Sequence, residues 1–295
     1  MHNASQNNVG LLGATSLVGE CLLSQLKQHD THVTAFSRQA VQSDNDYVTW
    51  CQLDAQKGQD AETIPSWLCV APIWTLPDHF NLLLAHGAKR IIALSSTSRF
   101  TKNNSSDPGE QLLAQRLKEY EARLRKWAMA NEIDWIILRP TLIYGLGKDK
   151  NITEIARFIQ RFGFFPLFGA GKGLRQPIHA EDVATACFNV LSCSNVKNQA
   201  YNLTGGETLS YRDMVNRIFA ASHRTPRMIT LPRWLFKLAI SFMCRLPRYH
   251  HWTTAMAERM NTDLVFECSD AKQDFNFTPR LFKLDPKDLP LGTAD

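Results

Sequence analysis

The sequence predicts an α/β fold, in which a doubly wound parallel sheet carries a smaller C-terminal lobe. Short apolar runs alternate with helical patterns from the start of the chain, and the 295 residues, 44% of them hydrophobic, suffice for one large core plus a smaller lobe. This alternation is typical of parallel sheets with helices on both faces. Such sheets bind ligands beyond the carboxyl ends of their strands.

The predicted elements follow one another as strands and helices. The strand patterns are VGLLGA, HVTAFS, YVTWCQL, SWLCVA and RIIALSS, and the first is followed by the helical pattern LVGECLLSQLKQH. A long amphipathic helix is predicted from Pro108 to Asn131, since proline favours the first turn of a helix. Residues 135–138 then form a buried strand. Beyond it the connections are aromatic and glycine-rich, so we expect a sheet domain over 1–165 and a smaller, interleaved lobe over 166–295.

Composition excludes several classes of protein. The 33 basic and 28 acidic residues give a net charge of +5, which is too weak and too dispersed to predict a nucleic-acid surface. The seven cysteines are odd in number and form no CxxC pair, which argues against a disulfide framework and a zinc site. The N-terminal MHNASQNN lacks the basic and apolar regions of a secretion signal, so we expect a cytoplasmic protein.

The segment 231–247 is the most hydrophobic late stretch. Arg233, Lys237 and Arg245 interrupt it, and it is too short to span a bilayer. We interpret it as an amphipathic helix packed on the smaller lobe. Contact with a membrane surface is the less favoured alternative.

The segment GLLGATSLVG, from Gly10 to Gly19, follows a strand and opens a helix. In this context Gly13 allows a sharp turn, Gly19 allows close helix packing, and free amides at the helix N-terminus can hold a pyrophosphate. The turn resembles the GATGFIG-like turn of the extended short-chain dehydrogenases, which have a Rossmann-type fold, and in particular of the NAD-dependent epimerase/dehydratase family that acts on nucleotide-sugars. Ser16 replaces its middle glycine. The resemblance implies cofactor contacts from Gly13, Thr15, Ser16, Leu17, Val18, Gly19, Ser37, Arg38, Asp54, Ala71, Pro72, Pro140 and Tyr144.

The second strand ends at Ser37 and Arg38, without the acidic residue that would bind the ribose of NAD. An arginine just after this strand can pair with a 2′-phosphate, so NADP is the expected cofactor and NAD the alternative. An ordinary solvated charge is the other interpretation of Arg38.

The resemblance also implies a catalytic site, of which only a part is present. Thr97 stands at the family's catalytic hydroxyl position and Ser96 precedes it. Aligning the family's KxxxExxL on Glu121 places Leu113 and Leu117 at its YxxxK tyrosine and lysine, and leucine transfers no proton. The YxxxK spelled by Tyr144 and Lys148 follows a different strand and is interpreted as a chance match. Lys102 and Glu110 are the alternative proton-transfer groups.

The segment GAGKGLRQPIHAED resembles the family's GxGxxxRxxxHVxD, whose arginine approaches the substrate phosphates. Arg175 is therefore the expected phosphate ligand. His179 is a second candidate for the substrate site, although His179 and Asp182 also suit a role in organising the lobe. The expected small-molecule partner is a nucleotide-sugar.

Three function hypotheses remain. The first is an NAD(P)-dependent epimerase, dehydratase or reductase. The second is a non-catalytic module that binds a dinucleotide and recognises a partner, which the loss of YxxxK favours. A membrane-associated protein acting on a lipid-linked sugar ranks third, and homodimerisation is left open.

Overall fold

The structure is a computed structural model that describes residues 8–41, 46–53, 62–231 and 258–290. Its centre is a seven-stranded sheet in the order β11-β6-β5-β4-β1-β2-β3, in which each pair of neighbours is parallel. The strands are β1 (Val9–Leu12), β2 (Val33–Ser37), β3 (Val48–Gln52), β4 (Ser66–Cys69), β5 (Arg90–Leu94), β6 (Asp134–Pro140) and β11 (Gln199–Leu203). The strand order reverses between β1 and β4, and the predicted Rossmann-type α/β class is confirmed.

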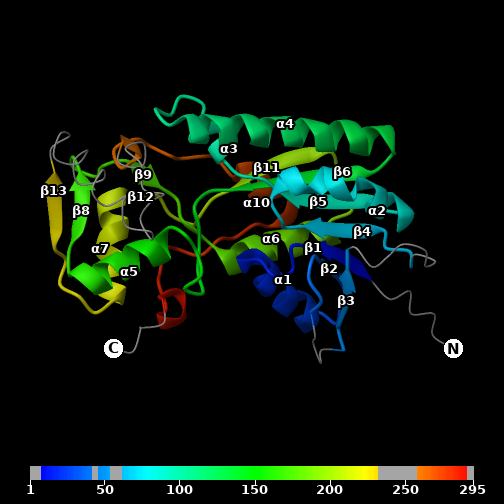
Figure 1. Cartoon of the computed structure of the whole chain (residues 1–295), viewed down its shortest axis with the longest axis horizontal. Coiled ribbons are helices and arrows are strands. Elements are labelled where there is room, and N and C mark those ends of the chain that lie inside the picture. Colours follow the sequence, from blue (N-terminus) through cyan, green and yellow to red (C-terminus); the bar gives the residue numbers. More distant parts are fainter. Residues whose placement is uncertain (1–7, 42–45, 54–61, 232–257, 291–295) are drawn as a thin grey trace.

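Helices cover both faces of this sheet (Figure 1). On the lower face in that view α1 packs against α6, and the long helix α4 lies on the upper face. The helices of the two faces are α1 (Leu17–Gln28), α6 (Ala180–Ser192), η1 (Ile73–His79), α2 (Phe80–Ala85), α3 (Ser98–Thr101) and α4 (Pro108–Ala130). The predicted long helix is therefore confirmed to within one residue at its end.

Local sequence explains where two of these helices begin. Ser16 has an extended backbone and its hydroxyl accepts a hydrogen bond from the Gly19 amide at 3.1 Å, which makes it the N-cap of α1. Asp107 caps α4 in the same way, through the amides of Gly109 and Glu110. Pro108 then occupies the first position of α4, where its missing N–H costs nothing.

The smaller lobe gathers at one end of the sheet, on the left of Figure 1. Its own apolar cluster includes Phe158, Phe165 and Phe219. The elements here are β7 (Ile143–Tyr144), α5 (Ile152–Phe162), β8 (Phe165–Phe168), β9 (Leu174–Arg175), β10 (Ile178–His179), β12 (Leu209–Ser210), α7 (Tyr211–Ala221), β13 (Met228–Leu231) and η2 (Pro286–Asp288). The strands among them form two-stranded sheets, which are β10 with β7, β12 with β9, and β13 with β8.

The chain crosses between these two parts more than once. After β10 it returns to the main sheet, because α6 packs on α1 and β11 pairs with β6. The helix α10 (Ser269–Phe275) then adds Ala271 and Phe275 to the core beneath α1 and α6. The predicted division near residue 165 stays a prediction.

The predicted amphipathic segment 231–247 lies, apart from Leu231, outside the described residues. Among the helices that are described, none is long and apolar enough to cross a membrane.

Candidate functional site

The glycine-rich turn joins β1 to α1 at the point where the strand order reverses. Gly13 has a φ of +91°, and a Cβ placed there would lie 2.4 Å from the Ala71 backbone nitrogen. A Cβ on Gly19 would lie 2.2 Å from the Gly13 carbonyl oxygen. Both positions therefore require glycine for the close approach of the backbones. Ser16, in contrast, has an ordinary φ of −81° and tolerates a side chain.

The first amides of α1 are available at this turn. Ser16 Oγ accepts from the Gly19 amide, whereas the amides of Leu17 and Val18 have no acceptor among the described residues. Thr15 is exposed beside them. Free amides at a helix N-terminus attract anions, so the residues of the turn are suited to a pyrophosphate.

The other predicted cofactor residues lie at strand ends. Ser37 ends β2 and accepts from the Gln39 amide at 3.2 Å, and Arg38 is exposed just beyond it. Ala71 and Pro72 follow β4, and the Ala71 amide donates to the Leu12 carbonyl at 3.2 Å. Asp54 lies outside the described residues.

The main cavity, of about 410 Å³, lies between the end of β5 and the smaller lobe. Its wall on the sheet side includes Ser96, Thr97 and Lys102, and its wall on the lobe side includes Arg175 and Tyr211. The cationic side chains in the lining are those of Lys102, Lys150, Arg175 and Arg259. Glu154 also lines the cavity and pairs with Arg157, so cationic side chains outnumber carboxylates in the lining, which suits the cavity to an anionic ligand.

Arg175 is 4% exposed and lines this cavity from β9. Its Nη1 donates to the carbonyls of Leu174 at 2.7 Å and Thr262 at 2.8 Å, and its Nη2 donates to the carbonyl of Arg259. Within the described chain, no carboxylate lies at ion-pair distance from it. Burial lowers the pKa of Arg175 to about 10, as expected for a charge removed from water.

The predicted hydroxyls stand at the end of β5. The Thr97 hydroxyl donates to the Pro140 carbonyl at 3.2 Å, and Ser96 Oγ accepts from the Ser98 amide at 3.1 Å. Both residues line the cavity, and so does Lys102, whose Nζ lies 3.4 Å from Glu110 Oε1. The structure thus brings Ser96, Thr97 and Lys102 to one wall.

Leu113 and Leu117, which were predicted at the YxxxK positions, are not among the residues that line this cavity. Leu117 is 3% exposed in the core between the sheet and α4, and Leu113 packs against the same core. One turn further along α4, Glu121 is fully buried. Its carboxylate accepts from Arg139 at 2.6 Å and from Ser95 Oγ at 2.6 Å, and it also pairs with Arg99.

Tyr144 and Lys148 do not converge on Thr97. Tyr144 is fully buried in the lobe, and its hydroxyl donates to the Lys283 carbonyl at 3.3 Å. Burial raises the pKa of Tyr144. Lys148 instead pairs with Glu20 on α1 at 2.5 Å. Their YxxxK spacing therefore forms no catalytic pair.

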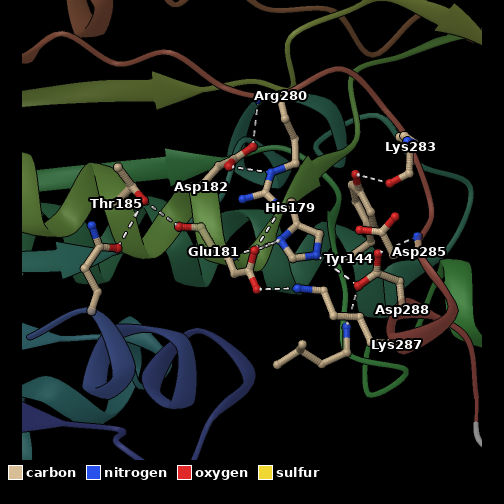
Figure 2. A network of polar contacts seen from close by, with 12 residues as sticks. Tyr144, His179, Glu181, Asp182, Thr185, Arg280, Lys283, Asp285, Lys287 and Asp288 are labelled. Atoms are coloured by element: carbon tan, nitrogen blue, oxygen red, sulfur yellow. Dashed lines mark hydrogen bonds and ion pairs between the residues drawn. The ribbon is translucent and has the colours of Figure 1, made fainter. Parts of the chain in front are cut away.

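His179 lies in a polar network that ties the C-terminal segment to the start of α6 (Figure 2). Its Nε2 faces Asp288 Oδ1 at 3.0 Å, and its Nδ1 accepts from the Glu181 amide at 3.1 Å. Arg280 bridges Asp182 and Glu181, both at 2.8 Å. His179 is 1% exposed, so it caps and anchors α6 rather than facing the main cavity.

Arg259 and Asp288 contribute to these networks and were not predicted from the sequence. No local motif marks either residue, since Arg259 pairs with Glu110 149 positions away and Asp288 meets His179 109 positions away. Only the folded chain brings these partners together. In the part of the chain that the structure describes, no group of His, Cys, Asp and Glu could hold a metal ion.

Comparisons with known proteins agree with this architecture. Residues 80–204 match the model of the NAD dependent epimerase/dehydratase family. The uncharacterized protein y4nG of Sinorhizobium fredii is 24% identical over 210 residues, which are 67% of this chain and 51% of that protein. UDP-glucose 4-epimerase of Vibrio cholerae is 22% identical over 120 residues, 41% of this chain and 37% of that protein. The matches thus span about half or less of these relatives.

A solved structure shows the same fold. The structure of UDP-glucuronic acid 4-epimerase from Bacillus cereus in complex with NAD superposes with a TM-score of 0.65 at 14% identity, covering 95% of each chain. The whole chain therefore shares the fold of this epimerase, and residues 80–204 are similar to the NAD dependent epimerase/dehydratase family, as the sequence predicted.

Proposed function

We propose that this chain binds a dinucleotide at the glycine-rich turn and a nucleotide-sugar in the main cavity, and that it acts as an epimerase, dehydratase or reductase. Arg175 carries the proposal, because its buried guanidinium lines the cavity without a carboxylate partner in the described part of the chain. A cation buried without an anion is costly. A bound phosphate would remove that cost.

The class of ligand follows from the charge of the cavity. Arg259 and Lys102 share one carboxylate, that of Glu110, while Lys150 and Arg175 add two further cations. A diphosphate matches such a site better than a single carboxylate does. The epimerases of V. cholerae and B. cereus that this chain resembles act, by name, on UDP-sugars. A nucleoside diphosphate-sugar is therefore the proposed substrate class.

The cofactor proposal rests on the turn. Gly13 and Gly19 allow the close approach of the backbones, and the amides of Leu17 and Val18 are free to hold a phosphate. Arg38 is exposed just beyond β2, and an arginine after this strand can pair with a 2′-phosphate, so we propose NADP over NAD. In titrations, Arg38→Ala should lose the preference for NADP and keep its affinity for NAD. Equal affinities in the unsubstituted protein would remove the argument.

A bound nicotinamide would supply hydride transfer to and from the substrate. Leu113 and Leu117 leave the usual proton-transfer pair absent from α4. We propose that the hydroxyls of Ser96 and Thr97 bind the reacting oxygen of the sugar and that one N–H of the Lys102 ammonium donates to it, which leaves the other N–H groups of Lys102 for Glu110 or for a ligand phosphate. Lys102→Met should then abolish turnover and leave dinucleotide binding intact.

Calorimetry with UDP-glucose tests the substrate proposal. Arg175→Ala should weaken binding by roughly tenfold or more, since a charge-assisted hydrogen bond contributes about 1.5 to 3 kcal/mol. Arg175→Ala also loses the hydrogen bonds to three carbonyls, which will lower the melting temperature. Arg175→Lys, which keeps the charge, therefore serves as a second variant and should bind UDP-glucose with intermediate affinity. Arg217→Ala, on the surface and paired with Glu207, is the matched control. Undiminished affinity in a folded Arg175→Ala protein would refute the proposed site.

A non-catalytic binding protein is the second candidate. It is favoured by the burial of Leu117 and by the hydrogen bond that the Thr97 hydroxyl donates to Pro140. Absorbance of the reduced nicotinamide separates the two candidates. Incubation with NADP and a panel of nucleotide-sugars should yield reduced or cycling cofactor if the chain is an enzyme. Tight binding of both ligands without turnover would favour the non-catalytic protein.

A further inference from the structure

Glu110, in the first turn of α4, is paired with two of the cations that line the main cavity. One carboxylate oxygen lies 3.4 Å from Lys102 Nζ, and the other forms an ion pair with the Arg259 guanidinium. Ser105 Oγ donates to the second oxygen at 2.7 Å. The Glu110 side chain is only 12% exposed, so this carboxylate is fixed on three sides and largely shielded from water.

The same contact joins two distant segments of the chain. Glu110 lies at the start of α4, whereas Arg259 lies in the turn of residues 258–262, which belongs to the lobe side of the cavity. Ser106 Oγ adds a second contact between these segments, to Glu258 at 2.8 Å. Arg175 holds that turn to the lobe through the carbonyls of Arg259 and Thr262.

The charges around the cavity are thus unevenly balanced. Lys102 and Arg259 have Glu110 as their counter-charge. Among the described residues the hydrogen-bond acceptors of Arg175 are carbonyls, and its guanidinium carbon lies 5.4 Å from the ring centre of Tyr211. Burial is the main cause of the lowered pKa of Arg175, and the nearby positive charge of Arg259 also lowers it. An incoming phosphate would be attracted by all of these cations, but Glu110 is already the ion-pair partner of two of them.

We propose that Glu110 is an internal counter-anion of the cavity, which competes with a phosphate-bearing ligand for Lys102 and Arg259. The inference rests on the proposed function in placing the ligand phosphates in this cavity. Glu110 keeps the two cations in place when the cavity holds no ligand. It lowers the affinity of the ligand, because the ligand phosphate must replace Glu110 as the partner of these cations. An anion of lower charge is attracted less strongly by these cations and displaces Glu110 less readily, so Glu110 favours a diphosphate over a single phosphate.

The test is calorimetry on the full chain with inorganic pyrophosphate, UDP and uridine as probes. Glu110→Gln should bind pyrophosphate and UDP about tenfold more tightly than the unsubstituted protein, because both cations become free. Uridine, which has no charge, should bind with equal affinity to both proteins. Glu207→Gln is the matched control, since it removes the same charge from the surface pair with Arg217 and should change pyrophosphate affinity less than twofold. An equal gain in the control would overturn the inference.

Ser105→Ala provides a second variant should Glu110→Gln not fold. It releases one of the three contacts of the carboxylate and should raise pyrophosphate affinity about threefold. Unchanged or weaker binding of pyrophosphate by folded Glu110→Gln, or by Ser105→Ala if only that variant folds, overturns the inference.

The outcomes also separate this inference from the proposed function. UDP binding that depends on Arg175, with no gain in Glu110→Gln, leaves the proposed function standing and refutes the role of Glu110. Pyrophosphate binding by Glu110→Gln alone, without UDP binding to the unsubstituted protein, supports the role of Glu110 and refutes the nucleotide-sugar site. Failure of both proteins to bind either anion overturns both.

Discussion

Glu121 balances the charge of two arginines at a fully buried position of α4. Arg139 donates to it from Nε and Nη2, Arg99 pairs with it, and both guanidinium groups lie over the ring of Phe100. Glu121 therefore links α4 to β6 through Arg139 and to the end of β5 through Ser95.

We expect Glu121→Ala to lower the free energy of unfolding by about 3 to 5 kcal/mol. Removing one partner of a buried ion pair leaves the other charges uncompensated, and here two arginines and the Ser95 hydroxyl lose their acceptor. Urea unfolding followed by circular dichroism measures the change. Glu119→Ala, at an exposed position of the same helix, should stay within about 0.5 kcal/mol of the unsubstituted protein. A loss below about 1 kcal/mol for Glu121→Ala would show that this network contributes little to stability.

For single residues, local motifs in the sequence predicted positions but not contacts between distant segments. Glu121 could be located because it resembles the acidic residue of the family's KxxxExxL, whereas its ion pairs with Arg99 and Arg139 were not predicted. The pairing of Glu110 with Arg259 could not be placed, because it joins residues 149 positions apart that have no shared periodicity. Arg175 was found by its motif, yet its burial and its carbonyl partners depend on the turn of residues 258–262.

Among the elements, the loop after β7 depends on the C-terminal segment. Asp288, in η2, accepts from the Leu146 amide at 3.1 Å, from His179 at 3.0 Å and from the Asp285 amide at 3.0 Å. These contacts fix the loop, the start of α6 and the C-terminal segment to one carboxylate (Figure 2). No sequence pattern predicted these contacts, because Asp288 lies 142 positions from Leu146 and 109 positions from His179.

This carboxylate should make stability depend on pH in the acid range. Burial acts to raise the pKa of Asp288, but the hydrogen bonds from His179 and from the two amides outweigh it, and the folded-state pKa lies below the ordinary value of 3.8. A lowered pKa contributes stability that is fully present above the unfolded-state value and is lost as pH falls through the folded-state value. Asp288→Asn should therefore destabilise the protein at pH 5, and the difference should shrink below about pH 4.

Urea unfolding of both proteins between pH 5 and pH 2 checks this expectation. Asp270→Asn, at an exposed position of α10, is a control that should show no such convergence. A difference between Asp288→Asn and the unsubstituted protein that stays constant over this range would mean that the carboxylate acts through its shape and not through its charge.

At the scale of the whole molecule, the central sheet followed from the sequence because its strands are short apolar runs separated by helices. The position of β11 did not, since a strand pattern gives no indication of its neighbour. In the structure β11 extends the sheet beside β6, and α6 covers α1. Elements beyond residue 165 therefore complete the core of the part that precedes it.

We expect residues 1–165 alone not to form a stable fold. Without α6, β11 and α10, the fragment would expose the apolar faces of α1 and of β6 that the intact chain buries in one cluster, and burial of apolar area is the main term that offsets chain entropy. The full chain should unfold in urea in a single transition that coincides by circular dichroism and tryptophan fluorescence. The fragment should show no cooperative transition and should bind a hydrophobic dye. A fragment that unfolds cooperatively, or a full chain with two separate transitions, would show that the sheet part is an independent unit despite the returning elements.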